Sequence, residues 1–146
     1  MPKRPAKRKK IGEHGGSRKR APYVVFISHS SKDQWIAMMM AEKIEALGAK
    51  VWIYEKNLEG GDIIMDSIFS GIEACNEAIV LVSSDSIDSQ WVLGEIGAIL
   101  GHRKRLTPIL NHTNPDDIVL LKGVAAIELT KFEQFLIELK NRVKQR

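Results

Sequence analysis

Two short runs, YVVFIS at Tyr23 to Ser28 and EAIVLVS at Glu77 to Ser83, decide the fold of this chain. Each is a nearly continuous row of large apolar residues, which is typical of a parallel strand covered by helices on both faces. Three further runs are predicted strands: AKVWIY at Ala49 to Tyr54, LTPIL at Leu106 to Leu110 and AAIEL at Ala125 to Leu129. The sequence therefore predicts a five-stranded parallel sheet.

A stretch with helical periodicity separates the first two strands. Ser30 and Asp33 are spaced as a capping box at the start of this helix, and Gly48 is placed to end it. The apolar residues that recur at helical spacing between them are Ala37, Met40, Ala41, Ile44 and Leu47.

Three more helices are expected, at Asp62 to Ala74, Ser86 to His102 and Thr130 to Lys144. Strands that alternate with helices form parallel sheets with helices on both faces. We therefore predict an α/β fold, a flavodoxin-like three-layer sandwich.

Length and composition limit the class of protein. The 146 residues are 44% apolar, which is enough for one ordinary domain. The longest apolar stretches, such as Ala78 to Val82, are far shorter than the roughly 20 residues of a membrane-spanning helix. Cys75 is the only cysteine, so an internal disulfide and a cysteine-built zinc site are excluded. We expect a cytoplasmic protein with no membrane association and no metal site.

Charge is distributed unevenly along the chain. Nine of the 22 Lys and Arg residues lie in residues 1–20, beside the single acid Glu13, so this segment carries +8 and the remainder −4. Such clustered charge with few apolar residues predicts a disordered basic tail at 1–20, in front of one domain at 21–146. Two interpretations of the tail stay open. It is either a polycation that binds nucleic acid weakly or binds an anionic surface, or it is a solvated leader.

The residues that follow the first strand, Ser28-His29-Ser30-Ser31-Lys32-Asp33, are rich in hydroxyl groups. In folds of this class ligands bind at the carboxyl ends of the strands. This stretch is neither GxGxxG nor a P-loop, which disfavours a conventional Rossmann dinucleotide site and an NTPase. A phosphate-accepting receiver domain would need an aspartate after the third strand, where Ser83 and Ser84 stand.

Glu95 is the only charged residue in Trp91 to Leu100, WVLGEIGAIL. At about 100° per residue, it lies between Trp91 and Ile99 at the margin of the apolar arc of this helix. Burying a carboxylate costs free energy unless the group is paired or used. From the pattern alone, Glu95 is either a functional group or an ordinary residue at the edge of an amphipathic helix.

The chain from Tyr23 to Lys144 resembles a TIR (Toll/interleukin-1 receptor) domain of the compact type common in bacteria. Three motifs in order carry the resemblance: FISHSSKD at 26–33, LEGG at 58–61, and Ser89-x-Trp91-x-x-x-Glu95. Enzymatic members of this family cleave NAD+ at the nicotinamide glycosidic bond and need the glutamate of the WxxxE stretch. The resemblance therefore implies the TIR fold, an NAD+ nucleosidase with Glu95 as its catalytic residue, and NAD+ as substrate without a cofactor.

A single acid suits this reaction. Glycosidases usually need a second carboxyl group to protonate the leaving group, but nicotinamide leaves a pyridinium as a neutral molecule. Glu95 would stabilise the positive charge that develops on the ribose. Trp52 and Trp91 are candidate surfaces for the cationic ring. The substrate-binding residues expected around Glu95 are Ser28, His29, Ser30, Trp52, Ser89 and Trp91.

The loop after the second strand is the expected assembly loop. Gly60 and Gly61 give it two flexible joints, and in TIR domains this loop joins neighbouring domains into a composite site. The alternative is a turn before a helix that Asp62 caps. The residues of this assembly loop are Leu58, Glu59, Gly60, Gly61 and Asp62.

The resemblance also implies partners and leaves two other functions open. Self-association through TIR–TIR contacts is expected, together with a separate sensor or effector protein in bacterial immune signalling and antiviral defence. One alternative is a non-catalytic TIR scaffold that assembles signalling proteins. The other is a nucleoside deoxyribosyltransferase-like enzyme, which has a related fold and also uses a glutamate. For the NAD+ reaction, the product is either ADP-ribose or a cyclic isomer.

Overall fold

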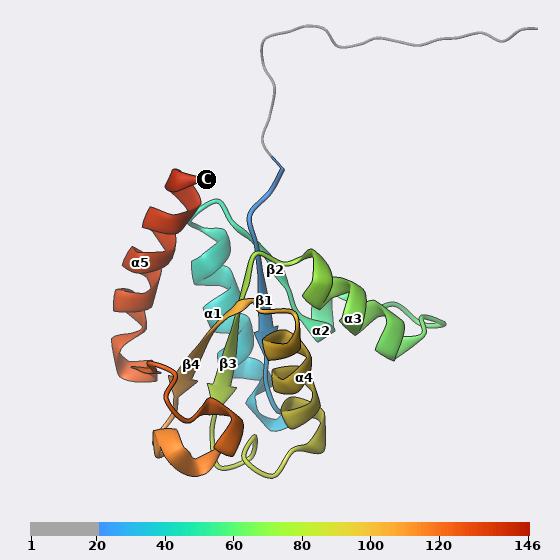
Figure 1. Cartoon of the computed structure of the whole chain (residues 1–146). Helices are drawn as coiled ribbons and strands as arrows, with labels where there is room; N and C mark the ends of the chain where they lie inside the picture. Colours follow the sequence, from blue (N-terminus) through green and yellow to red (C-terminus); the bar gives the residue numbers. More distant parts are fainter. Residues whose placement is uncertain (1–20) are drawn as a thin grey trace, which may run out of the picture.

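The computed structural model describes residues 21–146, and its centre is a parallel five-stranded sheet of order β2-β1-β3-β4-β5 (Figure 1). The basic tail predicted at 1–20 lies outside the described residues. β1 pairs with β2 on one side and with β3 on the other. The strands are β1 (Val24–Ser28), β2 (Lys50–Trp52), β3 (Glu77–Val82), β4 (Arg105–Leu110) and β5 (Ile127–Glu128).

Helices cover both faces of the sheet (Figure 1). Val25 and Ile27 of β1 pack with α1 (Gln34–Glu45) and α5 (Phe132–Gln145) in one apolar core. Phe26 points the opposite way and packs with α3 (Ile64–Ala74) and α4 (Gln90–Gly101) in the second core. Successive side chains of a strand point to opposite faces, so the run of apolar residues in β1 supplies both cores. This arrangement confirms the predicted flavodoxin-like three-layer sandwich.

The helices predicted from Asp62, Ser86 and Thr130 all begin later than expected, the last of them as α5 at Phe132. Polar side chains close turns in front of the first two. Asp62 does not cap α3, which starts at Ile64. Oδ2 of Asp62 instead accepts a hydrogen bond of 2.9 Å from the backbone N–H of Glu59. α4 starts at Gln90 rather than at Ser86, whose hydroxyl accepts a 2.7 Å bond from the N–H of Ser83.

The edge strands are shorter than predicted, and short helical turns occupy the chain between elements. β2 ends at Trp52, and the next turn is the unpredicted helix α2 (Tyr54–Asn57). The capping box predicted at Ser30 and Asp33 is also absent. Ser30 caps the 3₁₀ turn η1 (Ser31–Asp33) instead, and Asp33 makes no capping bond to α1. The remaining 3₁₀ turns are η2 (Pro115–Asp117), η3 (Val119–Leu121) and η4 (Leu129–Lys131).

A buried ion pair ties α5 to the amino end of the sheet. Glu77, the first residue of β3, is fully buried, and its carboxylate accepts hydrogen bonds of 2.8 and 2.9 Å from the guanidinium of Arg142. The hydroxyl of Tyr23 donates a further 2.5 Å bond to the same carboxylate. Burial, reinforced by the bond to Glu77, raises the pKa of Tyr23 to about 12. The hydrogen bonds to Glu77 likewise raise the pKa of Arg142.

Candidate active site

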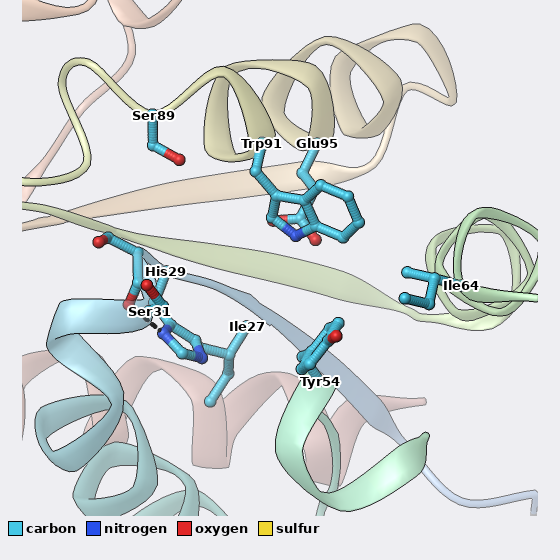
Figure 2. A pocket seen from close by; sticks show the side chains of 9 residues that line it. Ile27, His29, Ser31, Tyr54, Ile64, Ser89, Trp91 and Glu95 are labelled. Atoms are coloured by element: carbon cyan, nitrogen blue, oxygen red, sulfur yellow. Dashed lines mark hydrogen bonds between the residues drawn. The ribbon is translucent and has the colours of Figure 1, made fainter. Parts of the chain in front are cut away.

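A pocket of about 350 Å³ opens at the carboxyl end of β1, between the chain after β1 and helices α2, α3 and α4 (Figure 2). It contains five of the residues expected there from sequence: His29, Ser30, Ser89, Trp91 and Glu95. Ile27, Ser31, Tyr54 and Ile64 complete its wall and were not predicted.

Glu95 lies in the second turn of α4, on the side of the helix that faces β1. Only 7% of its surface is exposed, so the residue is more deeply buried than its position at the margin of the apolar arc suggested. The hydroxyl of Ser28 donates a 2.6 Å hydrogen bond to Oε1 of Glu95. Ser28 itself is 0% exposed and does not line the pocket. Its side chain therefore lies behind Glu95 and not on the pocket wall, where a substrate-binding residue was expected.

Two aromatic side chains stand beside Glu95 in the pocket (Figure 2). Trp91, one turn earlier on α4, is 41% exposed. The ring of Tyr54 meets it edge-on, with ring centroids 6.2 Å apart and planes at 83°. The sequence does not reveal Tyr54 because the run AKVWIY predicts a strand through this residue, whereas Tyr54 begins α2. A flat ring of a ligand would meet aromatic surface next to the carboxylate.

Trp52 does not belong to this pocket. Its indole stacks on Phe26 at 4.9 Å between centroids and packs against Gly71 of α3. It lines a different surface hollow, together with residues of α3. The prediction that Trp52 contacts the same ligand as Glu95 is not supported by its position.

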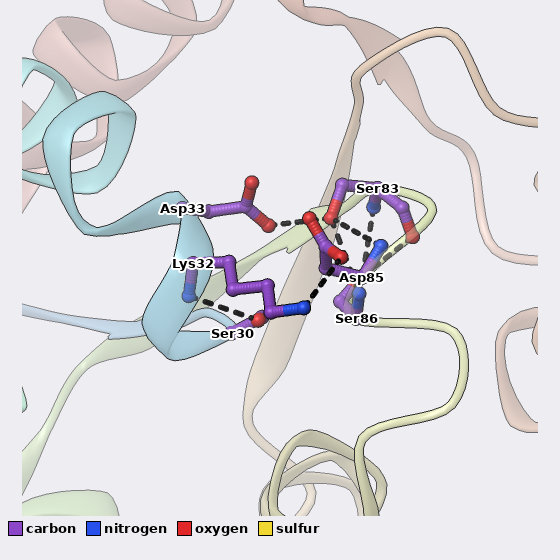
Figure 3. A network of polar contacts seen from close by, with 6 residues as sticks. All are labelled: Ser30, Lys32, Asp33, Ser83, Asp85 and Ser86. Atoms are coloured by element: carbon purple, nitrogen blue, oxygen red, sulfur yellow. Dashed lines mark hydrogen bonds and ion pairs between the residues drawn. The ribbon is translucent and has the colours of Figure 1, made fainter.

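A network of hydrogen bonds joins the segment after β1 to the segment after β3 (Figure 3). The hydroxyl of Ser83 donates to the buried carboxylate of Asp33 and accepts from the N–H groups of Asp85 and Ser86, each at 3.2 Å. The chain then runs to Ser89, whose hydroxyl caps α4 by accepting a 3.2 Å bond from the N–H of Val92. This network thus ties together the two segments that carry the pocket residues Ser31 and Ser89.

The predicted assembly loop is exposed at the rim of the same end of the sheet. Gly60, Gly61 and Asp62 are exposed, and Gly61 has φ +95°, a conformation that favours glycine. Apolar side chains continue this exposed surface into α3: Ile63 is 68% and Met65 47% exposed. Large exposed apolar side chains grouped beside a pocket are typical of interaction surfaces.

A family model for the TIR domain matches residues 25–139. The chain belongs to the TIR domain family. The resemblance found in its three motifs is thereby confirmed, and Glu95 stands in the WxxxE stretch of a TIR domain.

Curated relatives of this TIR domain have enzyme names, as three of them illustrate. It is 31% identical over 103 residues to the 2′ cyclic ADP-D-ribose synthase AbTIR of Acinetobacter baumannii, covering 66% of this chain and 38% of that protein. It is 28% identical over 129 residues to the probable 2′ cyclic ADP-D-ribose synthase BdTIR of Brachypodium distachyon, covering 83% of this chain and 58% of that protein. The NAD(+) hydrolase PdTIR of Paracoccus denitrificans is 26% identical over 113 residues, which cover 74% of this chain and 38% of that protein. The chain thus spans between about two fifths and three fifths of these relatives.

Solved structures support the same fold. A metazoan TIR-STING receptor from C. gigas aligns with a TM-score of 0.71 at 22% identity, over 84% of this TIR domain and 41% of that chain. Within residues 21–146, no helix has the length and apolar character needed to cross a membrane. The same residues include no group of three or more His, Cys, Asp or Glu side chains that could hold a metal ion. The thiol of Cys75 is buried and donates to the carbonyl of Ile72, and burial raises its pKa to about 11.

Proposed function

We propose that this TIR domain cleaves NAD+ between nicotinamide and ribose, with Glu95 as the catalytic residue. The observation that carries the proposal is a buried carboxylate on the wall of a pocket, one helical turn from a half-exposed indole. Curated relatives named as NAD(+) hydrolase and as cyclic ADP-D-ribose synthase support NAD+ over a simple nucleoside as substrate.

The chemistry requires little beyond this carboxylate. The C1′–N bond breaks with its electron pair going to the pyridinium nitrogen, so nicotinamide leaves neutral without a general acid. Positive charge appears on the ribose, and the carboxylate of Glu95 stabilises it through its position and its charge. Attack at C1′ by water gives ADP-ribose, and attack by a hydroxyl of the same molecule gives a cyclic isomer.

The exposed rim supports the related proposal that copies of this domain assemble around the substrate. A pocket of about 350 Å³ is near the lower limit of ligand sites, so a dinucleotide extends beyond it. A neighbouring copy at the assembly loop, Leu58 to Asp62, would supply a second wall. The same exposed apolar residues favour the scaffold as the second candidate function, in which assembly occurs without cleavage.

We propose bacterial immune signalling, including antiviral defence, as the setting, with a separate sensor or effector protein in the cytoplasm. The family membership supports this setting. For residues 1–20 we propose weak, salt-sensitive nucleic-acid binding, supported by their charge of +8. Removal of residues 1–20 should abolish that binding and spare NAD+ cleavage. Salt-insensitive binding that survives removal would contradict this role.

The deciding experiment is incubation of the full chain with NAD+, followed by chromatographic identification of the products. Glu95→Gln keeps the shape of the side chain and removes its charge, so cleavage should fall by at least about a hundredfold while the protein stays folded. Glu138→Gln, on the exposed side of α5, is the matched control and should keep full activity. A folded Glu95→Gln variant with undiminished turnover would disprove the catalytic assignment. Absence of products from the wild-type chain, assayed as an assembled sample, would favour the scaffold.

A further inference from the structure

The hydrogen bond between Ser28 and Glu95 joins a strand to a helix across the floor of the pocket. Ser28 is the last residue of β1, where it is held in register with Val80 of the neighbouring strand β3. Glu95 belongs to α4, and the helix backbone alone does not set the torsions of its long side chain. A 2.6 Å bond from a residue fixed in the sheet removes that freedom.

Ser28 cannot easily reach a ligand directly. Its surface is 0% exposed and it is absent from the pocket wall, whereas Glu95 lines the pocket above it. Any effect of this hydroxyl on the substrate must therefore pass through the carboxylate.

We infer that Ser28 is a positioning residue, whose hydroxyl fixes the orientation of the Glu95 carboxylate and favours its ionised form. The inference rests on the proposed role of Glu95. A hydroxyl that donates to a carboxylate stabilises the charged state, and the bond to Oε1 also sets the direction of Oε2. Charge and direction are the two properties that an electrostatic stabiliser of a cationic ribose needs.

The activity test separates positioning from substrate contact. Ser28→Ala should lower kcat about ten- to a hundredfold, the scale of one hydrogen bond to a charged group, and leave KM within about twofold. Ser28→Cys, with nearly the same shape and a weak donor, should behave like the alanine variant. Ser28→Thr keeps the hydroxyl but adds a methyl group to a fully buried position, so its rate per folded molecule should exceed that of the alanine variant. A raised KM with unchanged kcat would mean that Ser28 contacts substrate, and the inference would be overturned.

Thr107→Val is the matched structural control. Thr107 is a buried hydroxyl residue of β4 and lies away from the pocket wall. Its replacement removes a hydroxyl from the sheet interior, and kcat should stay unchanged. A loss of kcat in Thr107→Val equal to that in Ser28→Ala would assign the effect to general destabilisation and overturn the inference.

A second readout does not depend on catalysis. The carboxyl carbon of Glu95, assigned by its absence from the Glu95→Gln spectrum, can be titrated by ¹³C NMR. Among the side chains that the structure describes, the other titratable groups lining the two hollows bordered by Glu95 are His29 and Tyr54, and the substitution changes neither of them. Ser28→Ala should therefore move the titration midpoint of the Glu95 carboxyl group to higher pH. An unmoved midpoint would refute the effect of the Ser28 hydroxyl on this carboxyl group. If the wild-type chain does not cleave NAD+, the proposed function fails, while this titration still decides whether Ser28 controls Glu95.

Discussion

Two buried glutamates stand at opposite ends of the same sheet, and only one of them lines a pocket. At the amino end, Glu77 is enclosed completely and receives the guanidinium of Arg142 and the hydroxyl of Tyr23. At the carboxyl end, Glu95 receives the neutral hydroxyl of Ser28 and borders a pocket of about 350 Å³. Burial is therefore common to a structural and to a candidate catalytic carboxylate.

The difference between the two glutamates lies in what their partners do. A bidentate arginine neutralises Glu77 and occupies both of its oxygens, which leaves no chemistry to perform. The hydroxyl of Ser28 is neutral, so its bond to Glu95 adds no positive charge that would oppose a cation in the pocket. The comparison predicts that changes at the amino end alter stability, whereas changes at the carboxyl end alter activity.

The largest expected effect is on stability, from Arg142→Met. This substitution leaves the carboxylate of Glu77 buried without its cation, which should cost about 3 kcal/mol or more of the free energy of unfolding. Urea denaturation measures the loss, and NAD+ cleavage per folded molecule should be unchanged. An active-site defect in folded Arg142→Met protein would break the separation between the two ends.

A pair of glycines tests the same separation at a smaller scale. Gly48, between α1 and β2 at the amino end, and Gly61, after β2 at the carboxyl end, both have φ +95°. Alanine at either position is strained and should cost about 1–2 kcal/mol of stability. Only Gly61→Ala should also reduce activity, because it distorts the assembly loop.

Initial rate per mole of enzyme, measured over a wide dilution series, checks this expectation. The wild-type rate should rise with concentration because assembly obeys mass action, and the curve for Gly61→Ala should shift to higher concentration. Equal curves for Gly61→Ala and Gly48→Ala would argue that the loop has no part in assembly. A flat wild-type curve would mean that one chain holds the complete site.

The smallest effect is a pH dependence at the amino end. Folding raises the pKa of Tyr23 from 10.0 to about 12, so the stability it contributes is complete below pH 10 and is lost as pH rises through 12. Tyr23→Phe should be less stable than wild type by on the order of 1 kcal/mol below pH 10. Denaturation at several pH values should show that the difference in free energy of unfolding between the two proteins decreases between pH 10 and 12. Cys75 titrates in the same range, but it is present in both proteins and cancels. A difference in free energy of unfolding that stays constant over this pH range would show that Tyr23 does not titrate as described.

The sequence could predict the role of a residue where the local pattern of neighbouring residues makes it stand out. Glu95 was found because it is the only charge in a ten-residue apolar segment, and β1 because its Val and Ile residues face helices on both sides. Glu77 was missed because it begins a predicted strand, and its partner Arg142 lies 65 positions away. The role of Ser28 was also misjudged, since no periodicity shows that a strand residue lies beneath a helix residue 67 positions later. Such pairings depend on how elements pack, which local patterns do not encode.

The contact between Trp52 and Gly71 limits how this family member can evolve. A Cβ atom at position 71 would lie 2.7 Å from the indole of Trp52, closer than Cβ atoms in folded proteins approach non-bonded neighbours. Since that indole is also stacked on Phe26, it has little room to withdraw. Descendants of this protein should therefore keep glycine at 71 for as long as they keep tryptophan at 52, and should exchange the two residues together. Alignment of close homologues, or a saturation library at both positions, would display this dependence as paired substitutions.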